Sequence, residues 1–198
     1  SDDFASRFNQ KRTFSDWSRQ GLIQSLILVS RLGDSVNIPK ITNPQGWVDS
    51  IIEDLLKDAD GDLWISLDRD LPLISEASPN SFLKAINNSL EKDGPEIMDL
   101  FQEEEGFMHK TSHHTGLLWA LEGLAWFPDY LRDASLILLK LAKLDPGGNL
   151  SNRPINSVVE IYKPWHHQTL ASFNERMQIL EEVTISGYIK RANGDIMS

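Results

Sequence analysis

Prolines at the starts of amphipathic segments constrain the fold of this chain more than any other sequence feature. Asn43 suits an N-cap, and Pro44 suits the first helical position, where a missing N–H removes no intrahelical bond. Apolar residues then recur as adjacent pairs every four positions, on one helix face: Trp47, Val48, Ile51, Ile52, Leu55 and Leu56. Similar apolar spacing follows four further prolines: Pro79, Pro95, Pro128 and Pro154. The pattern predicts a chain of short, separately started helices.

Other segments predict helices without a proline start. They cover 14–32, 113–126 with Ser112 as the cap, and 168–184, while Pro72 divides the stretch 63–77 into a turn and a short helix. Asn152 is expected to cap the helix that Pro154 opens. Strand signals are poor, and the best candidate, 183–189, follows directly from a helix. We expect about nine helices and no sheet.

Short connections between amphipathic helices make neighbours antiparallel. The fold class predicted is therefore all-α, with antiparallel helix pairs stacked as an irregular α-solenoid. The sequence has no strict repeat, so a closed helical bundle is the alternative. We expect residues 1–198 to form one helical domain, with less regular stretches at 33–43 and 102–112. The second stretch is a possible division between 14–101 and 113–184, and 185–198 is expected to form a tail.

The totals exclude several classes of protein. The chain has no cysteine, which rules out a disulfide scaffold and a thiolate zinc site and fits a reducing cytoplasm. A net charge of −10 argues against nucleic acid as a partner, because phosphate binding needs a field of lysine and arginine. No apolar stretch approaches the roughly 20 residues that span a bilayer, and no secretory signal is present. We expect a cytoplasmic protein without a membrane partner, and a first residue other than Met suggests a piece of a longer protein.

Two groups of histidines are the only candidates for catalytic chemistry: His109, His113 and His114, then His166 and His167. His109 and His113 have the i, i+4 spacing that can hold one metal ion on a helix, and a run of glutamates lies nearby. Such a set would serve a metal-dependent hydrolase. The favoured interpretation is a loop without metal, because Gly106 and Ser112 separate His109 from the helix that follows.

Other catalytic motifs are absent. Asp58, Asp60 and Asp62 alternate as in a calcium loop, but the glycine and glutamate positions of an EF-hand do not match. The sequence contains no P-loop, no dinucleotide-binding GxGxxG and no GxSxG. We therefore expect neither an enzyme nor a cofactor.

Six tryptophans are a large number for helix packing alone. Trp17, Trp47 and Trp119 fall on apolar faces and are expected in the core. The others, near predicted helix ends, are candidate anchors for a protein partner, with packing against the ends of the core as the favoured alternative: Trp64, Trp126 and Trp165.

Residues 114–131 (HTGLLWALEGLAWFPDYL), 141–148 and 152–157 resemble the helical-repeat, HEAT-like region of large bacterial proteins. Some of those proteins look like STAND-type NTPases or antiphage-defence proteins, and 17–26 and 71–83 look like the same region. The resemblance covers most of 14–182 and implies an α-solenoid sensor or scaffold segment whose partner is a protein. Any NTPase would lie outside this chain.

Three functions remain open from the sequence. The first is a non-catalytic helical scaffold or sensor that binds another protein. The second is a metal-dependent hydrolase that uses the clustered histidines. The third is a self-associating structural module, in which one face of the array forms a homo-oligomer.

Overall fold

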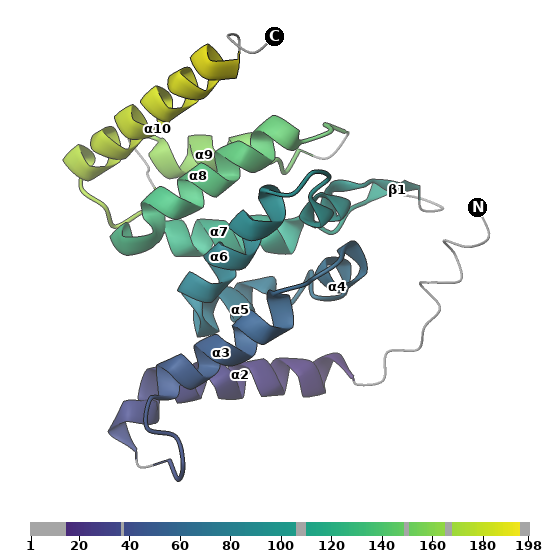
Figure 1. Ribbon diagram of the computed structural model, residues 1–198, viewed down its shortest axis with the longest axis vertical. Coiled ribbons are helices and arrows are strands. Elements are labelled where there is room, and N and C mark those ends of the chain that lie inside the picture. The colour runs from purple at the N-terminus through teal and green to yellow at the C-terminus, as the bar shows by residue number, and fades with distance from the viewer. Residues whose placement is uncertain (1–14, 37, 106–109, 149–150, 165–167, 195–198) are drawn as a thin grey trace.

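The computed structural model describes residues 15–36, 38–105, 110–148, 151–164 and 168–194, and this part of the chain is all-α (Figure 1). The α-helices are α2 (Asp16–Leu32), α3 (Pro44–Leu56), α4 (Gly61–Ser66), α5 (Leu71–Ala77), α6 (Pro79–Leu90), α7 (Thr115–Ala125), α8 (Pro128–Leu144), α9 (Pro154–Tyr162) and α10 (Phe173–Gly194). Two 3-10 helices, η1 (Gly33–Ser35) and η2 (Glu96–Phe101), and two short strands, β1 (Glu104–Glu105) and β2 (Lys110–Thr111), complete the described elements.

The start signals in the sequence explain most of the helix boundaries. The Asn43 side chain accepts the Gly46 N–H at 2.9 Å at the start of α3, and Asp60 accepts the Leu63 N–H at 2.8 Å at the start of α4. A proline occupies the first or second position of five helices: α3, α5, α6, α8 and α9. The caps predicted at Ser112 and Asn152 are wrong, because α7 and α9 are preceded by His114 and Arg153 without a capping side chain.

Two regions differ from the sequence-based expectation. β1 and β2 pair antiparallel, so the prediction of no sheet is wrong for this one ladder. A ladder of two residues in each strand is too short to produce an alternating pattern that the sequence could reveal. α10 continues to Gly194 across most of the predicted tail, because no proline interrupts the helix. It begins only at Phe173, because Ser172 and Glu175 form a capping box: the Glu175 N–H donates to Ser172 Oγ at 3.3 Å, and the Ser172 N–H donates to Glu175 Oε2 at 2.7 Å.

The helices pack in two rows. In one row α2, α5, α7 and α9 contact each other in succession, and in the other α3, α6 and α8 do so, with α10 against α8. The pairs α2–α3, α5–α6 and α7–α8 join the rows. α2 lies at one end of this stack and α10 at the other (Figure 1). Among the described residues, none of the helices has the length and apolar content that a membrane crossing requires.

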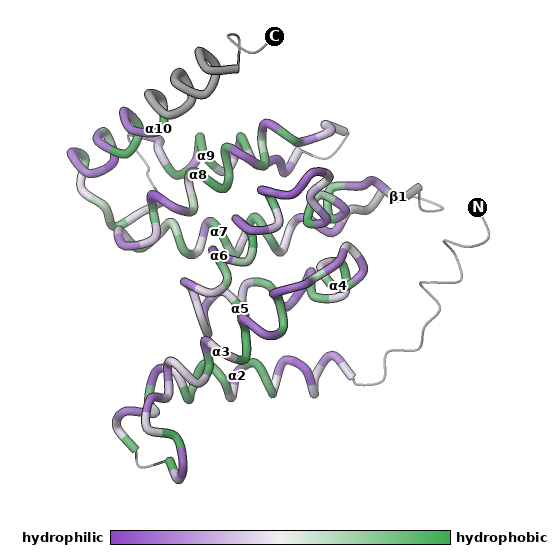
Figure 2. The backbone as a smooth tube through the Cα atoms, viewed as in Figure 1, coloured by the Kyte–Doolittle hydropathy of each residue, from purple (hydrophilic) through white to green (hydrophobic). Residues whose placement is uncertain are grey.

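The core runs along the space between the two rows. Figure 2 shows hydrophobic stretches along α5, α7 and α8 in the middle of the stack. The largest side chains that are completely buried there include Trp64, Phe82 and Phe101. The apolar face predicted for α3 is confirmed in its buried half by Val48, Ile52 and Leu56.

Candidate functional site

The two histidines that the structure describes face different partners. His113 Nδ1 lies 2.6 Å from Asp68 Oδ2, whereas His114 is completely buried among other groups. The remaining candidate ligands, His109, His166 and His167, lie outside the described residues. Within the described ranges, no group of three His, Asp or Glu side chains could hold a metal ion. The metal-site hypothesis thus rests on residues whose positions are not described, and it stays a prediction.

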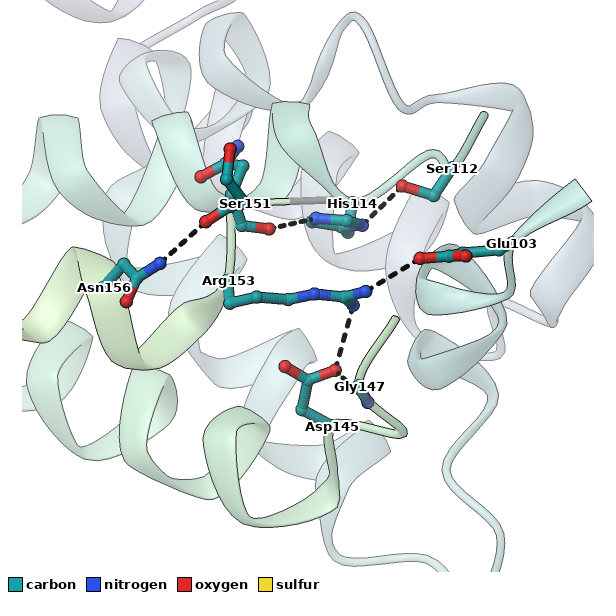
Figure 3. A network of polar contacts seen from close by, with 9 residues as sticks. Glu103, Ser112, His114, Asp145, Gly147, Ser151, Arg153 and Asn156 are labelled. Carbon is teal, nitrogen blue, oxygen red and sulfur yellow. Dashed lines mark hydrogen bonds and ion pairs between the residues drawn. The ribbon is translucent and has the colours of Figure 1, made fainter. Parts of the chain in front are cut away.

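His114 is hydrogen-bonded through both ring nitrogens (Figure 3), and one face of its ring is stacked on another ring. Its Nε2 lies 2.6 Å from the Asn152 carbonyl oxygen, and its Nδ1 lies 2.7 Å from Ser112 Oγ. Because a carbonyl oxygen only accepts, Nε2 carries the proton and Nδ1 accepts from the serine hydroxyl. The ring also stacks on Phe101, with centroids 4.8 Å apart and planes 6° from parallel.

The surroundings of His114 favour its neutral form. Burial lowers the pKa of His114, and the charge of Arg153 lowers it further, while the hydrogen bond to the Asn152 carbonyl opposes both. Through its two hydrogen bonds, this histidine links the Ser112 side chain to the backbone of Asn152.

Arg153 forms the second half of the same network (Figure 3). Its Nη2 donates to Glu103 Oε1 at 2.9 Å, and its Nη1 donates to Asp145 Oδ1 at 3.1 Å. These three side chains are at most 12% exposed. Gly148 fits tightly beside them, because a Cβ at that position would lie 1.8 Å from Glu103 Oε1. We call this network the polar seam, and its members are Glu103, Ser112, His114, Asp145, Asn152 and Arg153.

A second polar contact holds the same end of α7. Burial would raise the pKa of Asp68, but hydrogen bonds from His113 and from the Arg69 N–H, with the nearby positive charges, lower it below its usual value. The backbone packs closely at this point, since a Cβ on Gly116 would lie 1.7 Å from the Asp68 carbonyl oxygen. The start of α7 is therefore fixed both to the α4–α5 connection and, through the polar seam, to the α8–α9 connection.

The other end of α7 carries a different kind of site, formed by two adjoining cavities. One has a volume of about 640 Å³ and lies between α7 and residues of α2, α3, α5 and α6. The other has a volume of about 430 Å³ and lies between the end of α7 and Gln168. Both are lined by Trp119, Gly123 and Phe127, so these residues form the ridge between them. We call the two cavities and this ridge the aromatic groove.

The aromatic rings of the groove are exposed to solvent. Trp119 is 61% exposed, Trp126 44% and Phe127 46%. Along α7, Trp119, Gly123 and Trp126 follow the i, i+4, i+7 spacing of one helix face. The opposite face carries the completely buried Leu117 and Leu121. α7 therefore packs one apolar face into the core and presents a second one outward.

Burial divides the tryptophans differently from the sequence-based prediction. Trp64 is completely buried against the core, as the favoured alternative predicted, so the anchor hypothesis is wrong for this residue. Trp119, expected in the core, lies in the groove, while Trp17 at 85% and Trp47 at 42% are also exposed. Periodicity identifies an apolar face, but it does not reveal whether another helix covers that face.

Among the three proposed anchors, Trp126 is exposed as an anchor requires. Trp165 lies outside the described residues. Phe127 and the ridge position of Gly123 were not predicted from the sequence. The signal available for Phe127 was its place beside Trp126 in a two-residue connection between helices.

The charged groups that line the groove are mainly acidic. The lining contains one guanidinium, from Arg31, and three carboxylates, from Asp49, Glu76 and Glu122. Two of the carboxylates are oriented by the protein: Ser78 donates to Asp49 at 2.6 Å and Ser157 donates to Glu122 at 2.6 Å. The groove thus combines an aromatic ridge with an acidic rim.

The comparisons with known proteins give no family for this chain. No family model, no curated protein and no solved structure matches it.

Proposed function

We propose that this chain is a non-catalytic helical scaffold or sensor segment that binds another protein through the aromatic groove. The single observation that carries the proposal is the exposure of three aromatic rings in the groove: Trp119 and Phe127 on the ridge between the two cavities, and Trp126 in the smaller one. Tryptophan and other large rings dominate the energetics of protein interfaces when a partner covers them. Leaving them in water provides no stability to the chain itself.

Gly123 supports this proposal independently of the rings. An ideal Cβ at position 123 meets no atom within 4 Å, so packing inside the chain does not require a glycine there. A glycine inside a helix lowers stability relative to alanine. Its presence between Trp119 and Trp126 leaves space on the ridge for a partner side chain.

The rim indicates the chemistry of the partner. Asp49, Glu76 and Glu122 favour lysine or arginine beside the apolar anchors that the ridge would contact. The net charge of −10 adds a longer-range attraction for a basic segment. We therefore propose a partner segment with one or two large apolar side chains flanked by basic residues.

We infer the kind of parent protein from a resemblance: 114–131 and the other quoted segments resemble HEAT-like regions of bacterial proteins. We propose that the chain is an α-solenoid segment of a larger cytoplasmic protein of the STAND-type NTPase or antiphage-defence kind. The two rows of successively packed helices support that architecture.

A peptide selection tests the function without knowledge of the natural partner. A library of random peptides displayed on phage is selected on the wild-type chain, and synthetic copies of the enriched peptides are then titrated. We expect the double variant Trp119→Ala/Trp126→Ala to bind them at least about 100-fold more weakly. The enriched sequences should contain large apolar residues next to lysine or arginine.

The matched control is Trp47→Ala, which removes a tryptophan of similar exposure to Trp126 from α3, outside the groove lining. Its affinity for the enriched peptides should equal that of the wild type. Equal losses in the control and in the double variant would contradict the groove as the binding site. Enrichment of acidic peptides would contradict only the proposed partner chemistry.

A further inference from the structure

The outer face of α2 is apolar although α2 lies at the end of the stack (Figure 1). Ile23 and Leu26 are buried toward the rest of the chain. On the other side of the helix, Trp17 is 85% exposed, Leu28 59% and Leu32 53%. The end helix of a stacked array normally has a polar outer face. The apolar residues of this face lie outside the aromatic groove, whose lining takes Ser30 and Arg31 from α2.

The residues of this face are arranged symmetrically along α2. Trp17 and Leu32 lie at equal distances on either side of the point between Gln24 and Ser25, and so do Gly21 and Leu28. Trp17, Gly21, Gln24, Leu28 and Leu32 follow steps of three or four residues and therefore share one side of the helix. A second α2 running antiparallel about a two-fold axis at that point would place Trp17 on Leu32 and Gly21 opposite Leu28.

Gly21 fits this arrangement because it allows a close approach. A Cβ added at position 21 meets no atom within 4 Å, so the packing of the chain itself does not require glycine there. In an antiparallel pair, the absence of a side chain at Gly21 provides the space that Leu28 of the second copy would fill. Small residues permit such close contact between helix backbones.

The charges on α2 are also self-complementary. The segment 17–33 contains no Asp or Glu, although the whole chain has 29 acidic residues. Arg19 is directed inward, where it pairs with Asp70 and donates to the Ser66 carbonyl oxygen at 2.8 Å. Asp16 and Arg31 lie near opposite ends of α2, so the antiparallel pair brings Asp16 of each copy close to Arg31 of the other. Elsewhere the acidic surfaces of two copies would repel each other.

We propose that the outer face of α2 binds the same face of a second copy of this chain, as an antiparallel, two-fold helix pair centred between Gln24 and Ser25. The interface buries Trp17, Leu28 and Leu32 of both copies. Two-fold interfaces need a surface that is complementary to itself, and the residue order of α2 provides one. This proposal does not depend on the aromatic groove.

Introduced cysteines test the geometry directly, because the chain has none of its own. Gln24 is exposed beside the proposed axis, so Gln24→Cys should form a disulfide-linked dimer under mild oxidation. Asp54→Cys places a cysteine at an exposed position on α3 and should stay unlinked under the same conditions. Equal cross-linking of the two variants would overturn the proposal.

The mass in solution tests the energetics of the interface. Light scattering on the wild-type chain should show a mass that rises with protein concentration to twice the mass of one chain. Leu28→Glu should weaken the dimer at least about 100-fold, because a two-fold interface contains each substitution twice. Leu170→Glu changes an equally exposed leucine outside α2 and should leave the dimer unchanged.

Three outcomes of the mass measurement would overturn the proposal. The first is a monomer at every concentration reached, which would leave the face to a different protein. The second is a dimer that Leu28→Glu does not weaken. The third is a dimer that Leu170→Glu weakens equally.

Discussion

The two ends of α7 reverse the usual distribution of polar and apolar groups. At its start, His114 and Arg153 are buried in the polar seam with their hydrogen-bonding partners. From its middle to the connection that follows it, Trp119, Trp126 and Phe127 are exposed in the aromatic groove. A buried polar group stabilises a protein only when its partners are in place, and an exposed ring gains free energy only when something covers it. The seam therefore serves the fold of the chain, and the groove is available to a partner.

The polar seam and the aromatic groove each bring together segments that are far apart in the sequence. The seam joins Glu103 to Asp145 and Arg153, and so connects η2 and the ladder to the α8–α9 connection. The large cavity of the groove draws its lining from α2, α3, α5, α6, α7 and α8. Changes in the seam should therefore alter the stability of the fold, while changes in the groove should alter binding and leave stability nearly constant.

The largest expected effect is at the centre of the seam. Arg153→Met removes the cation that binds the buried carboxylates of Glu103 and Asp145, and should lower the free energy of unfolding by about 3–5 kcal/mol. Urea denaturation followed by circular dichroism measures the change. Lys84→Met removes the exposed ion pair with Glu53 and should lower the free energy of unfolding by less than about 1 kcal/mol. Equal losses for the two variants would show that the seam does not stabilise the fold.

The next effect is a dependence on pH through His114. Its pKa in the folded chain is lowered from the ordinary 6.5, so below about pH 6.5 the unfolded chain binds a proton that the folded chain does not. The free energy of unfolding should therefore fall as the pH drops from about 6.5 toward the lowered pKa, by at most about 1.4 kcal/mol per pH unit. Above pH 6.5 this contribution is constant.

His114→Phe isolates that dependence, because a phenyl ring can stack on Phe101 but does not titrate. The variant should be less stable at neutral pH, since Ser112 and the Asn152 carbonyl lose their bonds to the ring. Its stability should change less than that of the wild type between about pH 7.5 and about pH 5.5. Parallel curves for the two proteins in that interval would show that His114 is not the group responsible.

A smaller effect is expected on the ridge of the groove. Trp119→Ala should lower the free energy of unfolding by only about 1 kcal/mol, because most of the ring is already in contact with solvent. Replacing a completely buried tryptophan with alanine lowers the free energy of unfolding by about 3–5 kcal/mol. Trp64→Ala is therefore the matched comparison. Thermal unfolding of both variants checks the difference. A large loss for Trp119→Ala would place this residue with the core and remove it from the binding surface.

The smallest effect has the opposite sign. Gly123→Ala adds a methyl group that meets no atom within 4 Å, so it should raise stability by about 0.5–1 kcal/mol through the helix propensity of alanine. The same variant should bind the peptides selected on the wild-type chain more weakly, because the added methyl group occupies space on the ridge that a partner side chain would use. Lower stability would indicate that the fold itself requires this glycine.

The sequence by itself determined the local structure of most of the chain. The Asn43 cap and Pro44 placed the start of α3, and Pro79 and Pro128 placed the starts of α6 and α8, because these signals act through backbone groups within one turn. Apolar spacing identified the face of α3 that holds the buried Val48, Ile52 and Leu56, because residues three or four apart share a helix face. The absence of cysteine and of nucleotide-binding motifs was also visible in the sequence.

Only the tertiary structure decided which apolar faces are covered and which polar groups meet. Trp64 and Trp119 both lie on apolar faces, yet the first is completely buried and the second is 61% exposed, because burial depends on the neighbouring helices. His113 and His114 are adjacent in the chain, but the start of α7 directs one to Asp68 and the other to Asn152. Arg153 meets Glu103 across 50 residues. Local propensity acts over a few residues, whereas these contacts follow from how the two rows of helices pack.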